Sequence, residues 1–508
     1  MKKLLVFSSL FFCFVRADAQ FPLARHFWLN NNSYNHTLSP TSDGGYILAV
    51  ARQHLGANGR NTIAVFKLDP NYNIAAALPP RIIGLPGGTG GGFDVNVNFE
   101  VHDVIETVAE TVDDDGEVFE EILYIICGSI SHNGGPDMGM VTVVDAGLNT
   151  RSIREYPNAE VFYSVYADVG YFYVCGKTPT GSGIVLRDFI FPAAIPPMAY
   201  VTPLPWEYHK IKVNNFGRDL VVSGTDYSRV GFTAFSIAGG AFTPIVITTP
   251  IGPFFASWSF TLPLSFPKQL YSNSKVIVTD YPNNPTGLTL SFIQAERYGG
   301  VWYDADVLTY VFSSYTAPPI CHELWAFTTI FEPTFLSDAN TAPVGSQSYP
   351  NGGIAWVVNV NFNNRDDRFG LYIAMDLPLM PFPQSVSYIR SHPPLSLMGT
   401  EYTQLHKVHY HNGHFHCGGF YNHHDTITNT YNKTTLVMSP QQLANSTVCY
   451  VEQNQQNTWQ YSSPTRTPFT PIMVTVSVNF NPWIDVRYIF CDTDCDNSPL
   501  VPSNCGNR

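Results

Sequence analysis

The chain has 508 residues and a net charge of −13, with 14% aromatic but only 13% charged residues. The negative charge excludes nucleic-acid binding through a basic surface, and it opposes docking on anionic lipid. The 38 glycines, 38 prolines and many tyrosines are typical of many short strands rather than of helices. We therefore expect an all-β protein that has no nucleic-acid partner.

The first 19 residues are typical of a cleavable signal peptide. Lys2 and Lys3 precede the apolar run 4–15, which is too short to span a bilayer, and small residues at 17 and 19 frame a cleavage site. No later run reaches the roughly 18 apolar residues of a membrane helix. The sequence therefore predicts a secreted or cell-surface protein without membrane insertion, with residues 1–19 removed.

Pairs of apolar strands separated by a polar turn recur along the rest of the chain. The first pair covers residues 46–49 and 63–69, and similar pairs begin at residues 124, 172, 220, 276, 354 and 414. The shortest spacing, 48 residues, fits a four-stranded propeller blade of roughly 40–50 residues. One such hairpin cannot bury both of its faces, whereas copies stacked around an axis can.

The seven copies predict one β-propeller, most simply with seven four-stranded antiparallel blades; six or eight blades are the alternatives. A β-sandwich is the competing fold, but sandwiches lack a period this long. We expect the propeller over residues 20–440, with insertions at about 75–115 and 295–350 where the spacing lengthens. Residues 441–508 are then expected to complete the last blade and to form a Cys-containing tail.

The first copy also resembles a known repeat. TSDGGYILA and VFKLDPNYN, within residues 41–73, are similar to the units of secreted bacterial β-propeller proteins, which read roughly DGGYI-x-A-G and then a strand ending L-D-x-x-G-N. Residues 122–149 share the pattern more weakly, with Asp145 and Asn149 in the places of Asp69 and Asn73. The resemblance implies a propeller and an exported setting, but no single activity, because propellers host binding, scaffolding and catalysis. It also implies that residues 24–29 form an outer strand of the last blade.

Histidines cluster near the last copy. His409 and His411 alternate, as do His414 and His416, so each pair would share one face of a strand and could hold a transition-metal ion. A histidine-rich outer hairpin without metal is the alternative reading, and acid–base catalysis by these rings is a second one.

The C-terminal tail holds a second group of candidate ligands. Asp492, Asp494 and Asp496 alternate as at the start of a calcium loop, although position twelve is Ser503 instead of a bidentate acid. Cys491, Cys495 and Cys505 are disulfide candidates in an exported chain. Ca²⁺ or a transition metal are thus the ions that the sequence suggests, and it suggests no other cofactor.

Three further cysteines, Cys127, Cys175 and Cys417, occupy one position of the repeat. A cysteine at a repeated strand position is more simply a small buried residue than a nucleophile. The sequence has no Gly-x-Ser-x-Gly elbow, and nothing in it distinguishes two acids as a glycosidase pair.

We interpret the sequence as a non-catalytic extracellular binding or structural module, whose partner is a protein or a glycan that meets the loops at one end of the channel. A carbohydrate-active hydrolase or lyase on the same scaffold is one alternative, and a subunit of a larger cell-surface assembly is another. Carboxylates and histidines that converge at the channel mouth would favour the enzyme. A flat exposed apolar patch would favour the assembly.

Overall fold

The structure is a computed structural model, and it describes residues 24–27, 33–53, 60–87, 92–112, 118–168, 170–193, 195–214, 216–249, 252–261, 268–270, 275–281, 284–298, 301–316, 321–330, 334–343, 346, 352–361, 368–376, 386–392, 403–425, 430–439, 455–456, 459–461 and 465–487. The regular elements in these ranges are β-strands, apart from one 3-10 turn at Ala238–Gly240. The same ranges contain no helix that is long and apolar enough to cross a membrane. The predicted all-β class is confirmed.

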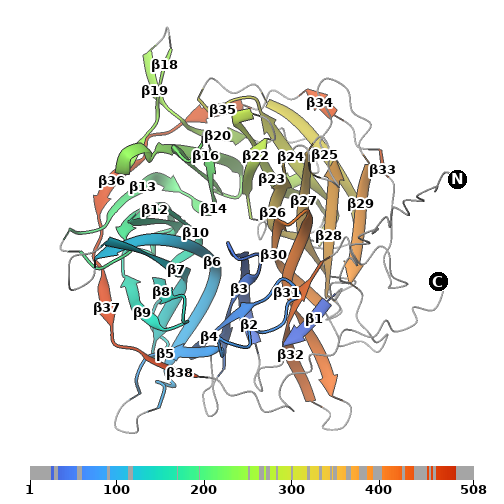
Figure 1. The fold of residues 1–508 in the computed structure, drawn as a ribbon. Coiled ribbons are helices and arrows are strands. Elements are labelled where there is room, and N and C mark those ends of the chain that lie inside the picture. The colour runs from blue at the N-terminus through green and yellow to red at the C-terminus, as the bar shows by residue number, and fades with distance from the viewer. Residues whose placement is uncertain are drawn as a thin grey trace, which may run out of the picture.

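Seven strands surround the axis of a closed ring, which gives the molecule the predicted propeller architecture (Figure 1). Each is the innermost strand of one antiparallel sheet, and strands that follow one another in the chain are neighbours in space, with the seventh returning to the first. The inner strands of blades 1 to 7 are β2 (Ser33–Pro40), β6 (Val97–Val112), β10 (Val161–Asp168), β14 (Glu207–Asn214), β22 (Ile277–Tyr281), β26 (Thr334–Ala342) and β30 (Thr403–His411).

Each blade continues outward through three more strands. The second strands are β3 (Tyr46–Arg52), β7 (Val118–His132), β11 (Tyr171–Lys177), β15 (Asp219–Thr225), β23 (Asn284–Tyr298), β27 (Gly353–Asn361) and β31 (His414–Asp425). The third strands are β4 (Thr62–Leu68), β8 (Met138–Asp145), β12 (Ser182–Phe189), β16 (Arg229–Ser236), β24 (Val301–Phe312), β28 (Arg368–Asp376) and β32 (Thr430–Met438). The fourth strands are β5 (Arg81–Gly84), β9 (Thr150–Tyr156), β13 (Met198–Pro205), β20 (Ser257–Thr261), β25 (Cys321–Ile330), β29 (Val386–His392) and, in blade 7, β1 (Ala24–Phe27).

The N-terminal strand therefore closes the ring, as the resemblance implied, because β1 pairs with β32 of the last blade. Two blades carry additional strands. In blade 4, β17 (Thr243–Pro244) pairs with β16, and in blade 5, β21 (Lys268–Leu270) pairs with β23. Between β17 and β20, a hairpin of β18 (Val246–Thr249) and β19 (Gly252–Phe255) projects from the ring (Figure 1).

The apolar runs predicted from the repeat are the second and third strands of six blades. These strands are apolar because the cores lie between neighbouring blades; β3 and β4, for example, are buried at every position. The copy that begins at Val276 is offset, since its two runs are the inner and second strands of blade 5. Asp69 and Asp145 make the same turn contact, because each carboxylate accepts the backbone N–H of the asparagine four residues later at 2.8 Å.

A β-bulge occurs at the same level in six of the seven inner strands. The inserted residues are Asn35, His102, Tyr163, His209, Ser337 and His406. The bulge explains the glycines of the repeat. A Cβ atom on Gly128 or Gly176 would lie 1.8 Å from a backbone oxygen of the bulged strand, so only glycine fits there.

A chain of six short strands surrounds the ring from outside, and we call it the C-terminal belt (Figure 1). Its strands are β33 (Gln455–Gln456), β34 (Trp459–Tyr461), β35 (Thr465–Pro468), β36 (Ile472–Thr475), β37 (Asn479–Asn481) and β38 (Ile484–Arg487). They pair in turn with the fourth strands of blades 6, 5, 4, 3, 2 and 1. The blades were predicted to have four strands each, but the belt adds one more strand to six of them. The added strand pairs with backbone N–H and C=O groups on the outer edge of the fourth strand, which would otherwise lack backbone partners.

Side chains fasten the belt to the blades. The Asp485 carboxylate accepts the Thr150 N–H at 2.9 Å, and the Ser477 hydroxyl donates to the Asn158 side-chain oxygen at 3.0 Å. Val476 is only 1% exposed and packs into the core between blades 2 and 3. The belt is therefore part of the packed structure.

The structure changes two of the predicted boundaries. Residues 455–487, expected to complete the last blade or to form a tail, add strands to the six other blades instead. The two expected insertions are largely blade strands: 75–115 contains β5 and β6, and 295–350 contains β24, β25 and β26. The spacing is long there because β6, β7 and β23 have 15 or 16 residues each.

The belt can be tested with two substitutions on the same segment. Val476→Asp buries a charge without a partner, so we expect it to lower the free energy of unfolding by about 3 kcal/mol or more. Met473 is 61% exposed, and Met473→Asp should change stability by no more than about 0.5 kcal/mol. Urea denaturation measures both, and equal effects of the two substitutions would contradict a packed belt.

Candidate functional site

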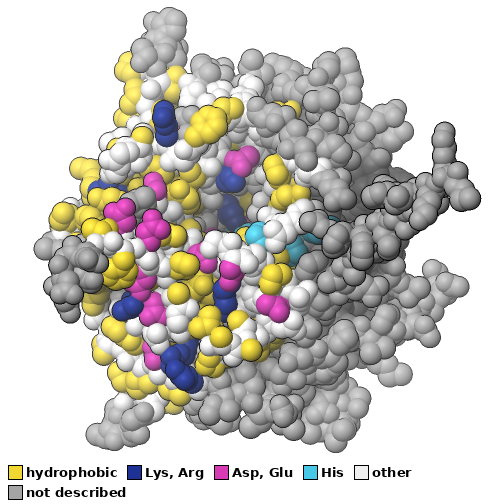
Figure 2. Space-filling model, viewed as in Figure 1, with side chains coloured by type: hydrophobic (Ala, Val, Ile, Leu, Met, Phe, Trp, Pro, Cys, Tyr) yellow, Lys and Arg dark blue, Asp and Glu magenta, His cyan; other side chains and the backbone are white. Residues whose placement is uncertain are grey.

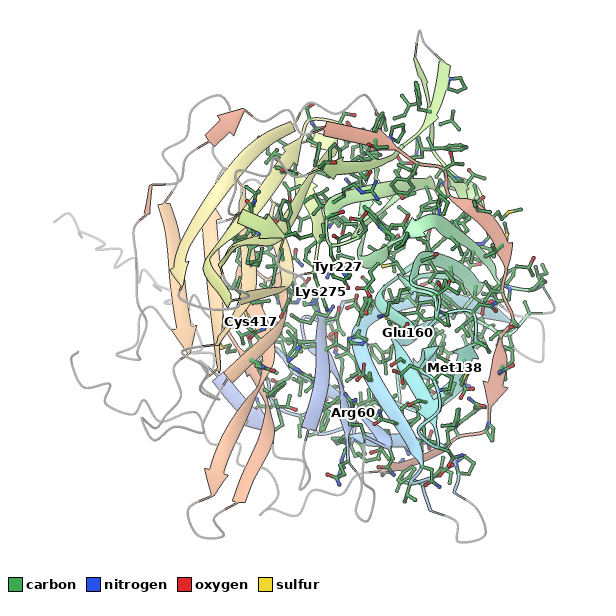
Figure 3. The ribbon with its side chains drawn as sticks, turned by 180° about the vertical axis from the view of Figure 1, so that it is seen from behind. Arg60, Met138, Glu160, Tyr227, Lys275 and Cys417 are labelled. Atoms are coloured by element: carbon green, nitrogen blue, oxygen red, sulfur yellow. The ribbon has the colours of Figure 1, made fainter. Side chains whose placement is uncertain are left out.

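Charged side chains gather at one mouth of the central channel, where the inner strands begin. We call this group the rim; it comprises Arg60, Glu100, Glu160, Lys177, Glu207 and Tyr227. Glu100 and Glu207 lie near the starts of β6 and β14, and Lys177 ends β11. Figure 3 shows Tyr227 close to the centre of the ring, with Glu160 further from the centre.

The rim consists of two sets of ion pairs and hydrogen bonds, one around Lys177 and one between Arg60 and Glu100. The ammonium of Lys177 lies 3.0 Å from a carboxylate oxygen of Glu160 and 3.0 Å from one of Glu207. The Tyr227 hydroxyl donates to Glu207 at 2.6 Å, and Arg60 pairs with Glu100 at 2.6 Å. Tyr227 has a positive φ of 66°, a backbone conformation that costs energy in a non-glycine residue and is often found at functional sites.

A second group lies one step deeper along the inner strands, and we call it the bulge layer. It consists of His102, Tyr163, His209 and His406, which the bulges insert, together with Lys275, which precedes β22. The Tyr163 ring lies 5.2 Å from the ring of His102 and 5.5 Å from that of His209, and the Lys275 ammonium lies 5.7 Å from its centroid. Lys275 is near the ring centre in Figure 3.

A third group lies next to the bulge layer, one residue further along the inner strands, and we call it the floor. It is made of Asp103, Ser164, Lys210, Asp338 and Lys407, the residues that directly follow the bulges. Asp103 of blade 2 pairs with Lys407 of blade 7 at 2.8 Å, and Lys210 of blade 4 pairs with Asp338 of blade 6 at 2.9 Å. Each ion pair spans an intervening blade, so the floor ties non-adjacent blades together.

The floor and the bulge layer also satisfy backbone groups of the inner strands. Asp103 accepts the N–H of Val165 on the next inner strand at 3.2 Å, and Asp338 accepts that of Val408 at 3.2 Å. The N–H of Val276 donates to Nδ1 of His209 at 2.9 Å. His209 therefore carries its proton on Nε2, which faces Glu207 at 3.3 Å.

Burial and charge determine the protonation states in the channel. Burial lowers the pKa of His102 and His209, against the opposing effect of Glu100 and Glu207, so both rings are neutral. Burial opposes ionisation of Glu207, but the hydrogen bonds that it accepts, led by that of His209, outweigh this and lower its pKa to about 2. Burial, followed by the charge of Lys407, lowers the pKa of Lys275 to about 8. The mouth therefore offers ionised carboxylates, neutral imidazoles and an amine that can exchange a proton near neutral pH.

Figure 2 shows that one face of the molecule is hollowed near the ring axis, with basic, acidic and histidine side chains around the hollow. The carboxylates and imidazoles of the mouth are the convergence that we expected to favour an enzyme. The same groups also suit a specific ligand site. Hydrogen-bond acceptors on the rim alternate with donors. This arrangement suits a ligand whose groups can both donate and accept hydrogen bonds.

The histidines predicted as metal ligands lie at the opposite end of blade 7. The hairpin of β30 and β31 places His409 opposite His416 and His411 opposite His414. His416 uses Nδ1 with the Tyr72 hydroxyl, and its Nε2 lies 3.1 Å from the His411 backbone oxygen. Over the described ranges, no group of three or more His, Cys, Asp or Glu side chains is placed to hold a metal ion. The metal assignment stays a prediction.

The remaining predicted site residues divide into two groups. Asp492, Asp494 and Asp496, with Cys491, Cys495 and Cys505, lie outside the described residues. Cys127, Cys175 and Cys417 are buried free thiols, as expected, and burial raises their pKa values. Their equivalence is only partial, because Cys127 and Cys175 pair with the residue that follows the bulge, whereas Cys417 pairs one position further on, with Val408.

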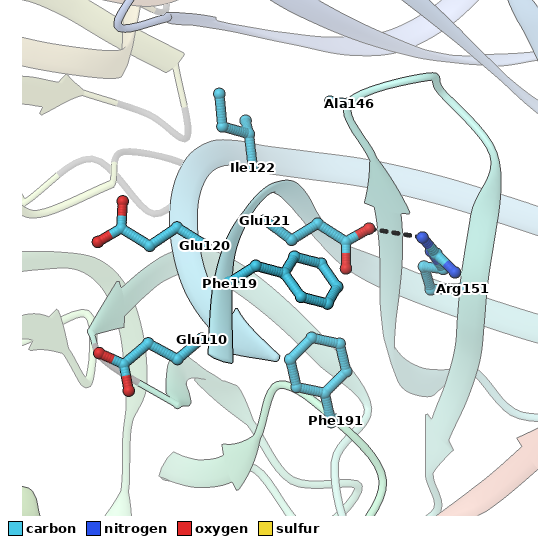
Figure 4. A pocket seen from close by; sticks show the side chains of 8 residues that line it. All are labelled: Glu110, Phe119, Glu120, Glu121, Ile122, Ala146, Arg151 and Phe191. Atoms are coloured by element: carbon cyan, nitrogen blue, oxygen red, sulfur yellow. Dashed lines mark hydrogen bonds and ion pairs between the residues drawn. The ribbon is translucent and has the colours of Figure 1, made fainter. Parts of the chain in front are cut away.

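An open pocket lies beside the long β6–β7 hairpin, far along the strands from the mouth (Figure 4). Its lining residues are Glu110, Phe119, Glu120, Glu121, Ile122, Ala146, Arg151 and Phe191. Glu121 pairs with Arg151 at 2.5 Å, and the pocket has no buried polar group aimed into it among the residues that line it. Phe119 is 46% exposed. This pocket therefore has fewer side chains suited to catalysis or to specific binding than the channel has.

The comparisons with known proteins give no family. No protein-family model matches the chain, and no curated protein matches it. A solved prolyl endopeptidase is similar with a TM-score of 0.38 and 12% identity, over 81% of this chain and 48% of that one. The present chain thus spans about half the length of that enzyme. An α-L-arabinofuranosidase from Fusarium graminearum, solved with an iminosugar inhibitor, has a TM-score of 0.37 and 10% identity, over 83% of this chain and 98% of that one. Similarities this weak carry no argument about the ligand or the reaction.

The channel residues were missed by sequence reasoning, although a signal for them exists. The inner strands carry two polar or aromatic residues before an aliphatic one: His-Asp-Val at 102–104, Tyr-Ser-Val at 163–165, His-Lys-Ile at 209–211 and His-Lys-Val at 406–408. The apolar runs that predicted the repeat lie mostly on the second and third strands. The recurring polar triplet marks the bulges and the residues beside them.

Buried neutral histidines make stability depend on pH. Burial lowers the pKa of His36 to about 3, whereas an unfolded histidine takes up its proton near 6.5, so the unfolded state binds more protons below that pH. The stabilisation is present above pH 6.5 and is lost as the pH falls toward 3. We expect His36→Leu to reduce the pH slope of the unfolding free energy by about 1.4 kcal/mol per pH unit between pH 6 and 4.

Leu38→Met on the same strand is the matched control, because Leu38 is fully buried but does not titrate. It should shift the whole curve without changing its slope. Denaturation curves at a series of pH values measure this, and an unchanged slope in the His36 variant would contradict a buried neutral ring.

Proposed function

We propose that the protein is a binding propeller whose ligand is a saccharide held at the rim of the channel. The observation that carries the proposal is the linked set of Glu160, Lys177 and Glu207, with His209 and Tyr227 on the same carboxylate. Sugar hydroxyls donate and accept hydrogen bonds, so they match a rim on which carboxylates alternate with ammonium and imidazole groups. Tyrosine rings beside these groups add apolar area for the CH faces of a sugar.

The exported setting, predicted from the sequence, is consistent with a glycan ligand. The negative net charge of the protein does not oppose this ligand. A neutral glycan is recognised through local hydrogen bonds, and the overall charge of the protein has little effect on it.

The test is a glycan-array screen followed by calorimetry on Glu207→Gln and Glu121→Gln. The two glutamates have similar exposure, 15% and 16% of their side chains, and each pairs with a cation, but Glu121 lies on the distant hairpin. We expect Glu207→Gln to weaken binding about tenfold or more, because the amide cannot accept all the hydrogen bonds of the carboxylate. Glu121→Gln should bind as the parent does. Equal affinity of the two variants, or a screen without any bound saccharide, would contradict the proposal.

A glycoside hydrolase is the second candidate, and the two carboxylates that share the Lys177 ammonium favour it. Release of reducing ends from a bound glycan, abolished by Glu160→Gln and kept in Glu121→Gln, would establish turnover. If the protein binds a glycan without releasing reducing ends, the non-catalytic binding module is supported and the hydrolase is rejected.

A further inference from the structure

The hairpin of β18 and β19 is an apolar element that projects from blade 4 (Figure 1). It lies within residues 230–267, a stretch of sequence that contains no Lys, Arg, Asp, Glu or His. Val246 on β18 is 54% exposed, whereas Ile247 beside it is only 7% exposed and packs into the core between blades 4 and 5. The hairpin is therefore a fixed apolar projection, and exposed apolar surface on a fixed element is typical of an interaction site.

The backbone of β18 forms an open strand edge. Among the described strands, β18 pairs with β19 and with no other. The N–H of Ala256 donates to the backbone oxygen of Ile245 at 2.8 Å. Because paired and outward-pointing residues alternate along an antiparallel strand, the backbone N–H and C=O groups of Val246 and Thr248 point away from β19.

Only one of the two strands offers a complete edge. Soluble proteins usually protect a free edge with a charge, a proline or a bulge. On β19, Pro253 lies opposite Thr248 and has no N–H to offer at the outer edge. The sequence of β18 is Val-Ile-Thr-Thr, which has no such protection and consists of good strand formers. A further strand would therefore pair with β18.

From this edge and the absence of charge around it, we infer that β18 pairs with β18 of a second copy of the chain to form a homodimer. A strand that pairs antiparallel with its own copy does so about a two-fold axis, so the same edge serves both protomers. An axis at Ile247 places Val246 opposite the partner's Thr248 and joins the two hairpins into one four-stranded sheet. Because the paired strands run in opposite directions, the two rings lie at opposite ends of this sheet.

The charge distribution favours a second copy as the occupant of this edge. The chain has a net charge of −13, so two copies repel each other over much of their surfaces. Residues 230–267 add nothing to this repulsion, and a contact there keeps the charged parts of the two rings apart. A bilayer is a poorer occupant, because the outward N–H and C=O groups of Val246 and Thr248 would have no partner in hydrocarbon. The inference concerns the outside of the ring and does not depend on the saccharide proposal.

Analytical ultracentrifugation of the full chain tests the inference. We expect a monomer–dimer equilibrium with a Kd on the order of 10–100 µM, because the contact is smaller than a standard protein interface. Val246→Lys should weaken the dimer at least about tenfold, since a lysine on an edge strand opposes pairing and the two-fold axis brings a second ammonium near it.

Ile195→Lys is the matched control. Ile195 lies between β12 and β13 and is 58% exposed, so its substitution adds the same charge at a similarly exposed apolar residue. This variant should dimerise as the parent does. A parent chain that stays monomeric up to about 1 mM, or equal dimerisation of the two lysine variants, would overturn the inference.

Hydrogen exchange locates the contact. In the parent, the amides of Val246 and Thr248 should exchange about fivefold more slowly at about ten times the Kd than at high dilution, because about one fifth of the chain is then monomeric. In Val246→Lys, the amide of Thr248 should exchange at the same rate at both concentrations. A dimer without this protection would have its contact elsewhere and would overturn the inference. A monomer that sediments with phosphatidylcholine vesicles, and loses this binding in Val246→Lys, would overturn it in favour of a bilayer.

Discussion

Two buried ion pairs that cross the ring, Asp103 with Lys407 and Lys210 with Asp338, are the interactions on which the rest of the channel depends. Burial of four charges costs free energy, which only close pairing and additional hydrogen bonds offset. Both aspartates have such additional bonds, since they accept backbone N–H groups of Val165 and Val408. The floor thus holds non-adjacent blades in register, and it supports the bulge layer and the rim above it.

The bulges link this floor to the repeat. Each of six inner strands carries one inserted residue, and a glycine on the second strand, such as Gly128 or Gly176, leaves space for the displaced backbone. Because the bulge recurs at one level, the residues that it presents collect in one layer. The β-bulge with its facing glycine therefore determines the packing of the blade, and it also determines which polar side chains are present in the channel.

The two ends of the chain complete the outer edges of the blades in different ways. β1 completes blade 7, as propeller closure from the N-terminus implies, and the C-terminal belt adds one strand to each of the other six blades. Each belt strand is only two to four residues long, so its hold comes from the sum of short pairings and from anchors such as Val476 and Asp485. Because one segment pairs with six blades, unfolding of any one blade would also remove belt pairings that stabilise its neighbours.

The propeller could be predicted from the sequence because pairs of apolar strands, in most blades the second and third strands, recur along the chain, even though their spacing varies. The belt could not, because its strands are too short for a pattern and are partly exposed; Ile472, for example, is 53% exposed. The site was missed for a related reason. Its residues, among them Lys275 and Glu207, are single polar side chains on or just before inner strands, and only the ring brings them together. Export and the relation to bacterial propeller repeats stay predictions.

A double-mutant cycle on Asp103→Asn and Lys407→Met tests the dependence on the cross-ring pairs most directly. Each single substitution should lower the unfolding free energy by about 3–5 kcal/mol, because it leaves a buried charge without its partner. The double variant should lose less than the sum, with a coupling energy above about 1.5 kcal/mol. The half-exposed pair of Lys212 and Asp280 is the reference, with a coupling below about 1 kcal/mol. Additive losses at Asp103 and Lys407 would contradict a floor that holds the ring together.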